Sequence, residues 1–166
     1  MKRRLLLGAA TGALLLAAGC ASPGGAPHAP GAGPRESWSG RLSLQVDSAP
    51  PQSFAALFEL RGSARAGELV LTSPIGSTLG ILRWSPGHAT LLNGRDSREF
   101  PSMDALSEAA TGAAIPIEAL FGWLQGNDQA VPGWRANLTQ VADGRLQATR
   151  DTPPPRAELR VIFDQP

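Results

Sequence analysis

Residues 67–84 read GELVLTSPIGSTLGILRW, and the order of residue types in this stretch predicts a β-hairpin. Two strand-like runs, Leu69–Thr72 and Thr78–Trp84, flank a short connector over residues 73–77. Leu69 and Leu71 alternate with Glu68, Val70 and Thr72, as expected for a strand with one buried face. The hairpin is therefore the unit from which the rest of the fold can be built outward.

The connector of this hairpin carries an unusual residue. Pro74 suits the first central position of a tight turn because its ring fixes φ, and Gly76 can close the turn. Ile75 lies between them, although the tip of a turn normally faces water and is polar. Two interpretations stay open: Ile75 folds back onto its own hairpin, or it projects as an apolar finger toward an apolar partner.

The segments around the hairpin follow the same period of two. Trp38, Leu42, Leu44 and Val46 share one face of a first strand that opens near residue 37, and polar residues occupy the other face. Breaks rich in proline and glycine separate this strand from the later runs. Further strands are predicted over residues 54–60, 89–92, 96–100, 134–141, 145–150 and 157–163.

The middle of the chain changes to a helical period. Ser102 is placed to cap a helix over Met103–Thr111, and Gly112 to end it. A second helix begins at Ile115-Pro116, and its apolar residues recur at helical spacing up to Leu124. Packing against the sheet would explain these residues, and so would the lining of a cavity. About nine strands interrupted by two helices predict a mainly β fold, a curled antiparallel sheet or incomplete barrel with the helices on its concave side.

The N-terminal segment has the pattern of a bacterial export signal. Residues 1–19 combine a basic start with an apolar run that is too short to span a bilayer. Cys20 follows this run and is the only cysteine of the chain, which excludes an internal disulfide and favours lipidation. An ordinary signal peptide with an incidental cysteine is the alternative. Residues 20–36 are rich in proline and glycine and predict a tether, and residues 37–166 form the folded body.

The composition argues against most catalytic chemistry. The formal net charge is +1, and no basic stripe favours nucleic acid. The body contains one histidine, His88, in a predicted turn, so nucleophile–histidine arrangements and His/Cys metal sites lack their components. Asp96, Glu99 and Asp104 are the nearest carboxylate cluster, and they are expected to be solvated. The chain is therefore expected to bind a ligand rather than to be an enzyme, with no metal and no cofactor.

Several motifs resemble those of the LolB family of outer-membrane lipoprotein receptors. They are the lipobox-like end of the signal and four segments of the body that follow in the family's order: Leu16–Cys20, Ser39–Leu42, Leu69–Leu82, Gly112–Gly126 and Leu159–Val161. The pattern SP-apolar-GS-T in the hairpin and the pattern IP…L..WL.G in the second helix are the most specific of these.

The resemblance implies an unclosed antiparallel β-barrel in which short helices cover a hydrophobic cavity. It also implies a function: the receptor accepts acylated lipoproteins from the periplasmic carrier LolA and places them in the outer membrane. The chain would be anchored there by Cys20, face the periplasm, and use the turn of Pro74, Ile75 and Gly76 for delivery to lipid. The acyl-chain cavity is predicted to be lined by residues that lie at suitable positions and whose side chains are expected to face inward: Leu42, Leu44, Phe58, Leu71, Leu82, Leu120, Trp123, Leu124 and Trp134.

Two other functions fit the anchor and the tether. A structural lipoprotein could dock on an envelope assembly machine through the hairpin, and such a protein would need no cavity. A sensor could use the same half-barrel to detect mislocalised lipid. The state of the concave face, open or tightly filled, separates the docking protein from the other two. In each case a monomer is expected.

Overall fold

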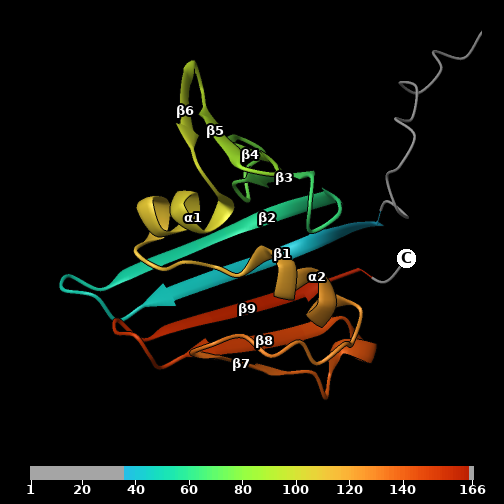
Figure 1. Ribbon diagram of the computed structural model, residues 1–166. Helices are drawn as coiled ribbons and strands as arrows, with labels where there is room; N and C mark the ends of the chain where they lie inside the picture. Colours follow the sequence, from blue (N-terminus) through green and yellow to red (C-terminus); the bar gives the residue numbers. More distant parts are fainter. Residues whose placement is uncertain (1–35, 165–166) are drawn as a thin grey trace, which may run out of the picture. The chain divides into compact units, whose positions relative to one another are not determined.

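A computed structural model of the chain describes residues 36–164 (Figure 1). This part of the chain forms nine β-strands, two α-helices and one short 3₁₀ helix. The strands are β1 (Glu36–Val46), β2 (Gln52–Gly62), β3 (Gly67–Thr72), β4 (Thr78–Ser85), β5 (His88–Asn93), β6 (Asp96–Phe100), β7 (Trp134–Asn137), β8 (Arg145–Arg150) and β9 (Ala157–Phe163). The helices are α1 (Met103–Thr111), α2 (Ile117–Leu124) and the 3₁₀ helix η1 (Val141–Asp143).

All nine strands belong to one antiparallel sheet with the order β6-β5-β4-β3-β2-β1-β9-β8-β7. The two edge strands, β6 and β7, do not pair with each other within the described residues, so the sheet does not close into a barrel. The predicted mainly β, unclosed antiparallel architecture is confirmed. The signal segment, Cys20 and most of the tether lie outside the described residues.

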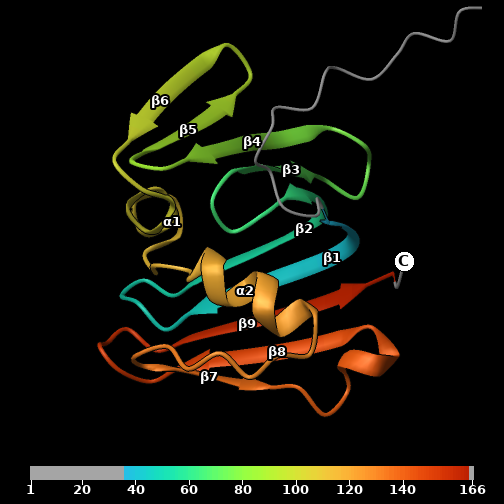
Figure 2. The same ribbon diagram turned by 45° about the vertical axis from the view of Figure 1, so that its right-hand side comes forward.

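Both helices lie on the same face of the sheet, which is called the inner face below (Figure 2). The helix α1 lies beside the end of the sheet formed by β5 and β6, and α2 lies over β1, β9 and β8. The opposite face, on which neither helix of residues 36–164 lies, is called the outer face. Neither helix of the described residues is long and apolar enough to cross a membrane.

The helix α2 is held by aromatic packing. The ring of Phe121 packs edge-to-face against Trp38 of β1 and Trp84 of β4, with centroids 5.4 and 6.2 Å apart. Trp123 packs against Trp134 of β7 with the centroids 6.3 Å apart, and its indole N–H donates to the carbonyl of Gln129 at 3.0 Å. Because these contacts join both halves of the sheet, α2 fixes the curvature of the body.

The hydrophobic core lies between Trp38 and Phe163 in the sequence. The described residues 36–164 all belong to one compact unit. A hydrophobic core of this extent is what an independently folding domain requires. The body can therefore be studied without the signal segment.

Gly40 explains the Ser39–Leu42 motif of the first strand. Its φ is +152°, and a Cβ at this position would lie 2.0 Å from the carbonyl oxygen of Ile162 on β9. Any side chain would thus push β9 away from β1. Glycine is required here because the two strands approach each other closely at the centre of the sheet.

The helix ends follow the sequence signals closely. The side chain of Ser102 accepts from the N–H of Ala105 at 3.1 Å, and Gly112 adopts the left-handed conformation that ends α1. Pro116 occupies the N-cap of α2 rather than its first turn, so the helix begins at Ile117 and not at the predicted Ile115-Pro116. The N-cap residue of a helix needs an extended backbone conformation, and the φ of −75° that Pro116 adopts is compatible with it.

One strand was predicted too long. A strand over residues 134–141 was expected, but β7 ends at Asn137 and Val141 belongs to η1. The side chain of Asn137 accepts from both the N–H and the hydroxyl of Thr139, at 3.1 and 2.7 Å. This local turn competes with the sheet for the backbone and ends the strand, which periodicity alone does not reveal.

Replacing Ser107 should destabilise the connection between the helices. Its buried hydroxyl accepts from the N–H of Ile115 at 2.8 Å and donates to the carbonyl of Asp104 at 3.0 Å. Ser107→Ala leaves the Ile115 N–H without this partner, so the free energy of unfolding should fall by about 1–3 kcal/mol in urea denaturation. The exposed Ser85→Ala is the control, and equal stability of the two variants would contradict this role.

Candidate functional site

A cavity of about 360 Å³ lies between α1 and the inner face of the sheet. Strands β1 to β5 supply most of its wall, and α1 covers it from the other side. The apolar lining consists of Leu42, Leu44, Phe54, Leu69, Leu71, Leu79, Leu82, Leu91, Met103, Leu106, Ile115 and Ile117. Few polar side chains reach it: Asn93, Arg98, Ser107 and Thr111. Such a lining suits an apolar ligand.

Three small residues keep this cavity open. Gly80 of β4 lines it, and a Cβ there would lie 3.3 Å from the side chain of Leu91. On the opposite wall, Ala109 and Ala110 of α1 line the cavity and are exposed. Larger residues at these positions would occupy space that the apolar wall now encloses.

The structure places the predicted cavity residues in two groups. Leu42, Leu44, Leu71 and Leu82 line the cavity under α1. The other five are buried and lie outside its lining, in the core that α2 packs against: Phe58, Leu120, Trp123, Leu124 and Trp134. The concave side is thus filled beneath α2 and open beneath α1.

The sequence interpretation missed the contribution of α1. Met103 and Leu106 are buried on the helix face that covers the cavity, and Ile115 and Ile117 extend the same wall. A signal existed in the spacing of Met103, Leu106 and Ala110, which share one helical face. What the sequence does not reveal is which of the two helices packs tightly.

The turn between β3 and β4 has the predicted geometry. The N–H of Gly76 donates to the carbonyl of Ser73 at 2.9 Å, so Pro74 and Ile75 occupy the two central positions. Gly76 has a φ of +88°, and the N–H of Ser77 donates to the Ser73 hydroxyl at 3.1 Å. These bonds fix the tip while leaving its side chains free. Ile75 is 90% exposed, so the interpretation that it folds back onto the hairpin is wrong.

Leu79 connects this turn to the cavity. The pairing of β3 with β4 shifts register so that Leu71 faces Gly80 while Thr72 faces Thr78, which leaves Leu79 as the extra residue of a bulge. Leu79 is 36% exposed and also lines the cavity. Leu79 therefore belongs both to the cavity wall and to the hairpin that carries the exposed tip at Ile75.

The described residues offer no catalytic centre of the usual kinds. No group of three or more His, Cys, Asp or Glu side chains between residues 36 and 164 could hold a metal ion. His88 is exposed and lies 3.1 Å from the hydroxyl of its neighbour Thr90. Within this part of the chain the apolar cavity and the turn are the features that point to a ligand.

Asp104 lies at a second depression, which shares Met103 and Ile117 with the wall of the apolar cavity. This depression of about 510 Å³ is formed by the starts of both helices and the loops near residues 64 and 130. Partial burial, and to a smaller extent the negative charge of Glu118, raise the pKa of the Asp104 carboxyl. The lining is more polar than that of the cavity under α1, which makes it a poorer match for an alkyl chain.

The described part of the chain matches a known protein family over nearly its whole length. Residues 36–163 match the family described as "Outer membrane lipoprotein LolB". The chain belongs to the LolB family. The match extends from the first residue of β1 to the last residue of β9, so it includes the hairpin, both helices and every strand of the sheet.

Individual relatives agree with the family match. A protein of Bordetella petrii named outer-membrane lipoprotein LolB is 32% identical, over 95% of this chain and 91% of the relative. Proteins of the same name from Cupriavidus pinatubonensis and Cupriavidus metallidurans are 35% and 33% identical. Those alignments cover 87% and 69% of this chain, and 70% and 56% of the relatives.

Proposed function

We propose that this chain is an outer-membrane lipoprotein receptor that accepts acylated lipoproteins from a LolA-like periplasmic carrier and inserts them into the outer membrane. The single observation that carries the proposal is the open apolar cavity under α1, whose wall includes Leu79 of the same hairpin that presents the exposed Ile75. Family membership supports the same role. The role is one of binding and transfer, without chemical change of the substrate.

The acyl chain of the substrate is the ligand that suits the cavity. Each methylene that leaves water for an apolar environment contributes about 0.8 kcal/mol. The lining offers mainly aliphatic side chains, so binding depends on burial rather than on specific hydrogen bonds. A receptor of this kind can accept lipoproteins of unrelated sequence, because the acyl chains are the feature that they share.

The size of the cavity suggests that α1 moves on loading. A methylene group fills roughly the volume of a water molecule, about 30 Å³, so 360 Å³ holds about a dozen of them. That is part of one acyl chain, and mature bacterial lipoproteins carry up to three. The helix α1 buries only Met103, Leu106 and Ser107, whereas α2 buries six of its residues. The lightly packed wall is the one that can give way.

Delivery to the membrane is assigned to the turn at Ile75. An exposed isoleucine forgoes about 1.5–3 kcal/mol of burial in the free protein, and it can recover this energy in the lipid interface. Leu79 lies between the tip and the cavity, so a chain that leaves the cavity meets apolar side chains before it meets lipid. The anchor at Cys20, outside the described residues, would keep the body beside its destination.

The state of the inner face favours a receptor over a docking protein. A structural lipoprotein that only docks on an assembly machine has no use for an open cavity with an apolar lining. The cavity under α1 is open, while the α2 side of the same face is filled. A lipid sensor would share the cavity, but it would not need the exposed apolar tip at Ile75.

Replacing Ile75 should separate acceptance from delivery. Ile75→Glu puts a charge at the exposed tip, where no packing is lost, so the protein should fold and accept a lipoprotein normally. Insertion into vesicles should fall at least tenfold, because a carboxylate resists entry into lipid. Ile75→Leu, which keeps the apolar character, is the matched control. Undiminished insertion by the glutamate variant would refute the role of the tip.

Filling the cavity should impair acceptance. Ala110→Trp places a large side chain on the exposed wall of α1, where it can occupy the cavity without displacing the core. The affinity for a fluorescent fatty-acyl probe should fall about tenfold or more, since several methylenes lose their contacts. Ala66→Trp, in the exposed turn between β2 and β3, is the control. Equal probe binding by both variants would show that acyl chains bind elsewhere.

A further inference from the structure

The outer face of the sheet carries a row of alternating apolar and basic side chains. Arg41 of β1 pairs directly with Leu57 of β2 and with Ile162 of β9, and Ile162 in turn pairs with Arg145 of β8. The direct sequence neighbours of these four residues belong to the core side of the sheet: Leu42, Phe58, Val161 and Leu146. Because successive side chains of a strand point to opposite faces, the row itself faces outward. Directly opposite side chains lie about 5 Å apart, so the two guanidinium groups flank Ile162.

This row lies in a shallow groove that continues to the delivery turn. Arg41, Leu57 and Ile162 line an outer-face groove of about 440 Å³, together with Pro74. A second groove of about 280 Å³ contains Ile162 and Arg145. Pro74 is the direct sequence neighbour of Ile75, so the groove reaches the delivery turn. Ile162 is 57% exposed, so a large apolar side chain lies open to solvent between the two arginines.

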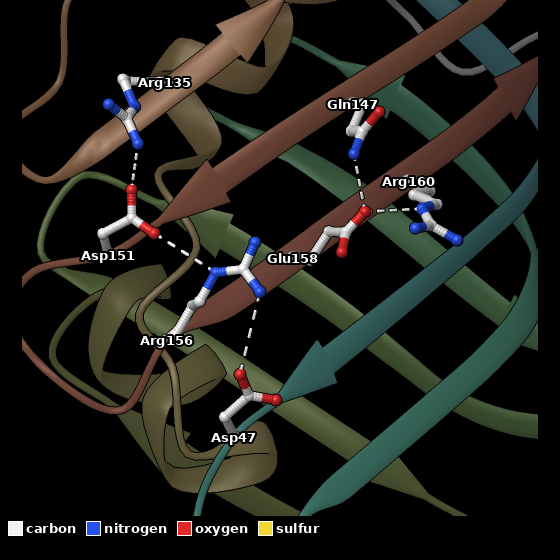
Figure 3. Close-up of polar contacts among 7 residues, drawn as sticks. All are labelled: Asp47, Arg135, Gln147, Asp151, Arg156, Glu158 and Arg160. Carbon is white, nitrogen blue, oxygen red and sulfur yellow. Dashed lines mark hydrogen bonds and ion pairs between the residues drawn. The ribbon is translucent and has the colours of Figure 1, made fainter.

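The two arginines of the row differ from the other charges on this face. Glu158 accepts from Arg160 at 2.6 Å and from Gln147 at 2.7 Å, so both of those side chains are occupied (Figure 3). Asp151 and Asp47 are bridged by Arg156, and Arg135 pairs with Asp151 (Figure 3).

Arg41 and Arg145, in contrast, form no ion pair with the residues that the structure describes. In the next row Glu59 pairs with Arg61, and Asp164 accepts a hydrogen bond from Ser39. Two cations therefore remain available beside an exposed isoleucine.

We propose that the row of Leu57, Arg41, Ile162 and Arg145 is a docking surface for a bilayer that contains anionic phospholipid. The guanidinium fork matches the oxygens of a phosphate group, and apolar side chains between basic ones suit the boundary between headgroups and acyl chains. The inference rests on the proposed function and deepens it. The row would hold the body against the membrane so that the neighbouring tip at Ile75 enters the lipid.

Vesicle binding tests this surface. Residues 21–166, which lack the acylated cysteine, are sedimented with vesicles of phosphatidylcholine alone or of phosphatidylcholine mixed with phosphatidylglycerol. The unmodified body should bind the anionic vesicles more tightly. The double variant Arg41→Gln/Arg145→Gln should lose about fivefold in that affinity for each arginine, and added salt should have a similar effect. The double variant should bind neutral vesicles as weakly as the unmodified body does.

The control is a double variant with the same change in charge. Arg65→Gln/Arg95→Gln alters two exposed arginines in the turns after β2 and β5, away from the row. Preserved anionic binding by this control, together with loss in the first variant, supports the docking surface. Equal binding by both double variants, or no preference of the unmodified body for anionic vesicles, overturns it. Uptake of the fatty-acyl probe by the same samples reports separately on the proposed function.

Discussion

Two short helices have to cover the inner face of a nine-stranded sheet, and they do so unequally. The helix α2 brings Phe121 between Trp38 and Trp84 and Trp123 against Trp134, so it is fixed to strands from both halves of the sheet. These contacts curl the sheet around α2. The helix α1 is left with the remaining inner face, which it covers without filling, and the apolar cavity is the result.

This division assigns stability and function to different parts of one face. The aromatic contacts at α2 supply large buried surfaces and satisfied indole N–H groups, as a core requires. The side chains around the cavity at α1 lack some of the packing contacts of a filled core, and the Ile75 side chain is exposed to water instead of buried. Natural proteins accept such costs where a ligand or a membrane supplies the missing contacts. The cavity and the turn at Ile75 belong to one hairpin, and the bulge at Leu79 within β4 lies between them and adds an apolar side chain to the cavity wall.

Much of this arrangement could be predicted from the sequence. The period of two placed the strands, and Ser102 and Gly112 marked the ends of α1, because these signals act within a few residues. The length of β7 could not be predicted, since it depends on the competition between the Asn137 side chain and the sheet. The cavity lining was predicted only in part. Leu42 and Trp123 are equally apolar and both face inward, and only the placement of the two helices decides which one lines open space.

The transfer step itself tests the central claim most directly. Residues 21–166, without the acylated cysteine, would be mixed with a purified LolA-like carrier that is loaded with a radiolabelled lipoprotein, and the two proteins would then be separated by affinity pull-down. The account predicts that the label moves to this body without ATP, because its cavity takes up the acyl chains. A label that stays on a verified cognate carrier, although the body is well folded, would contradict the receptor function.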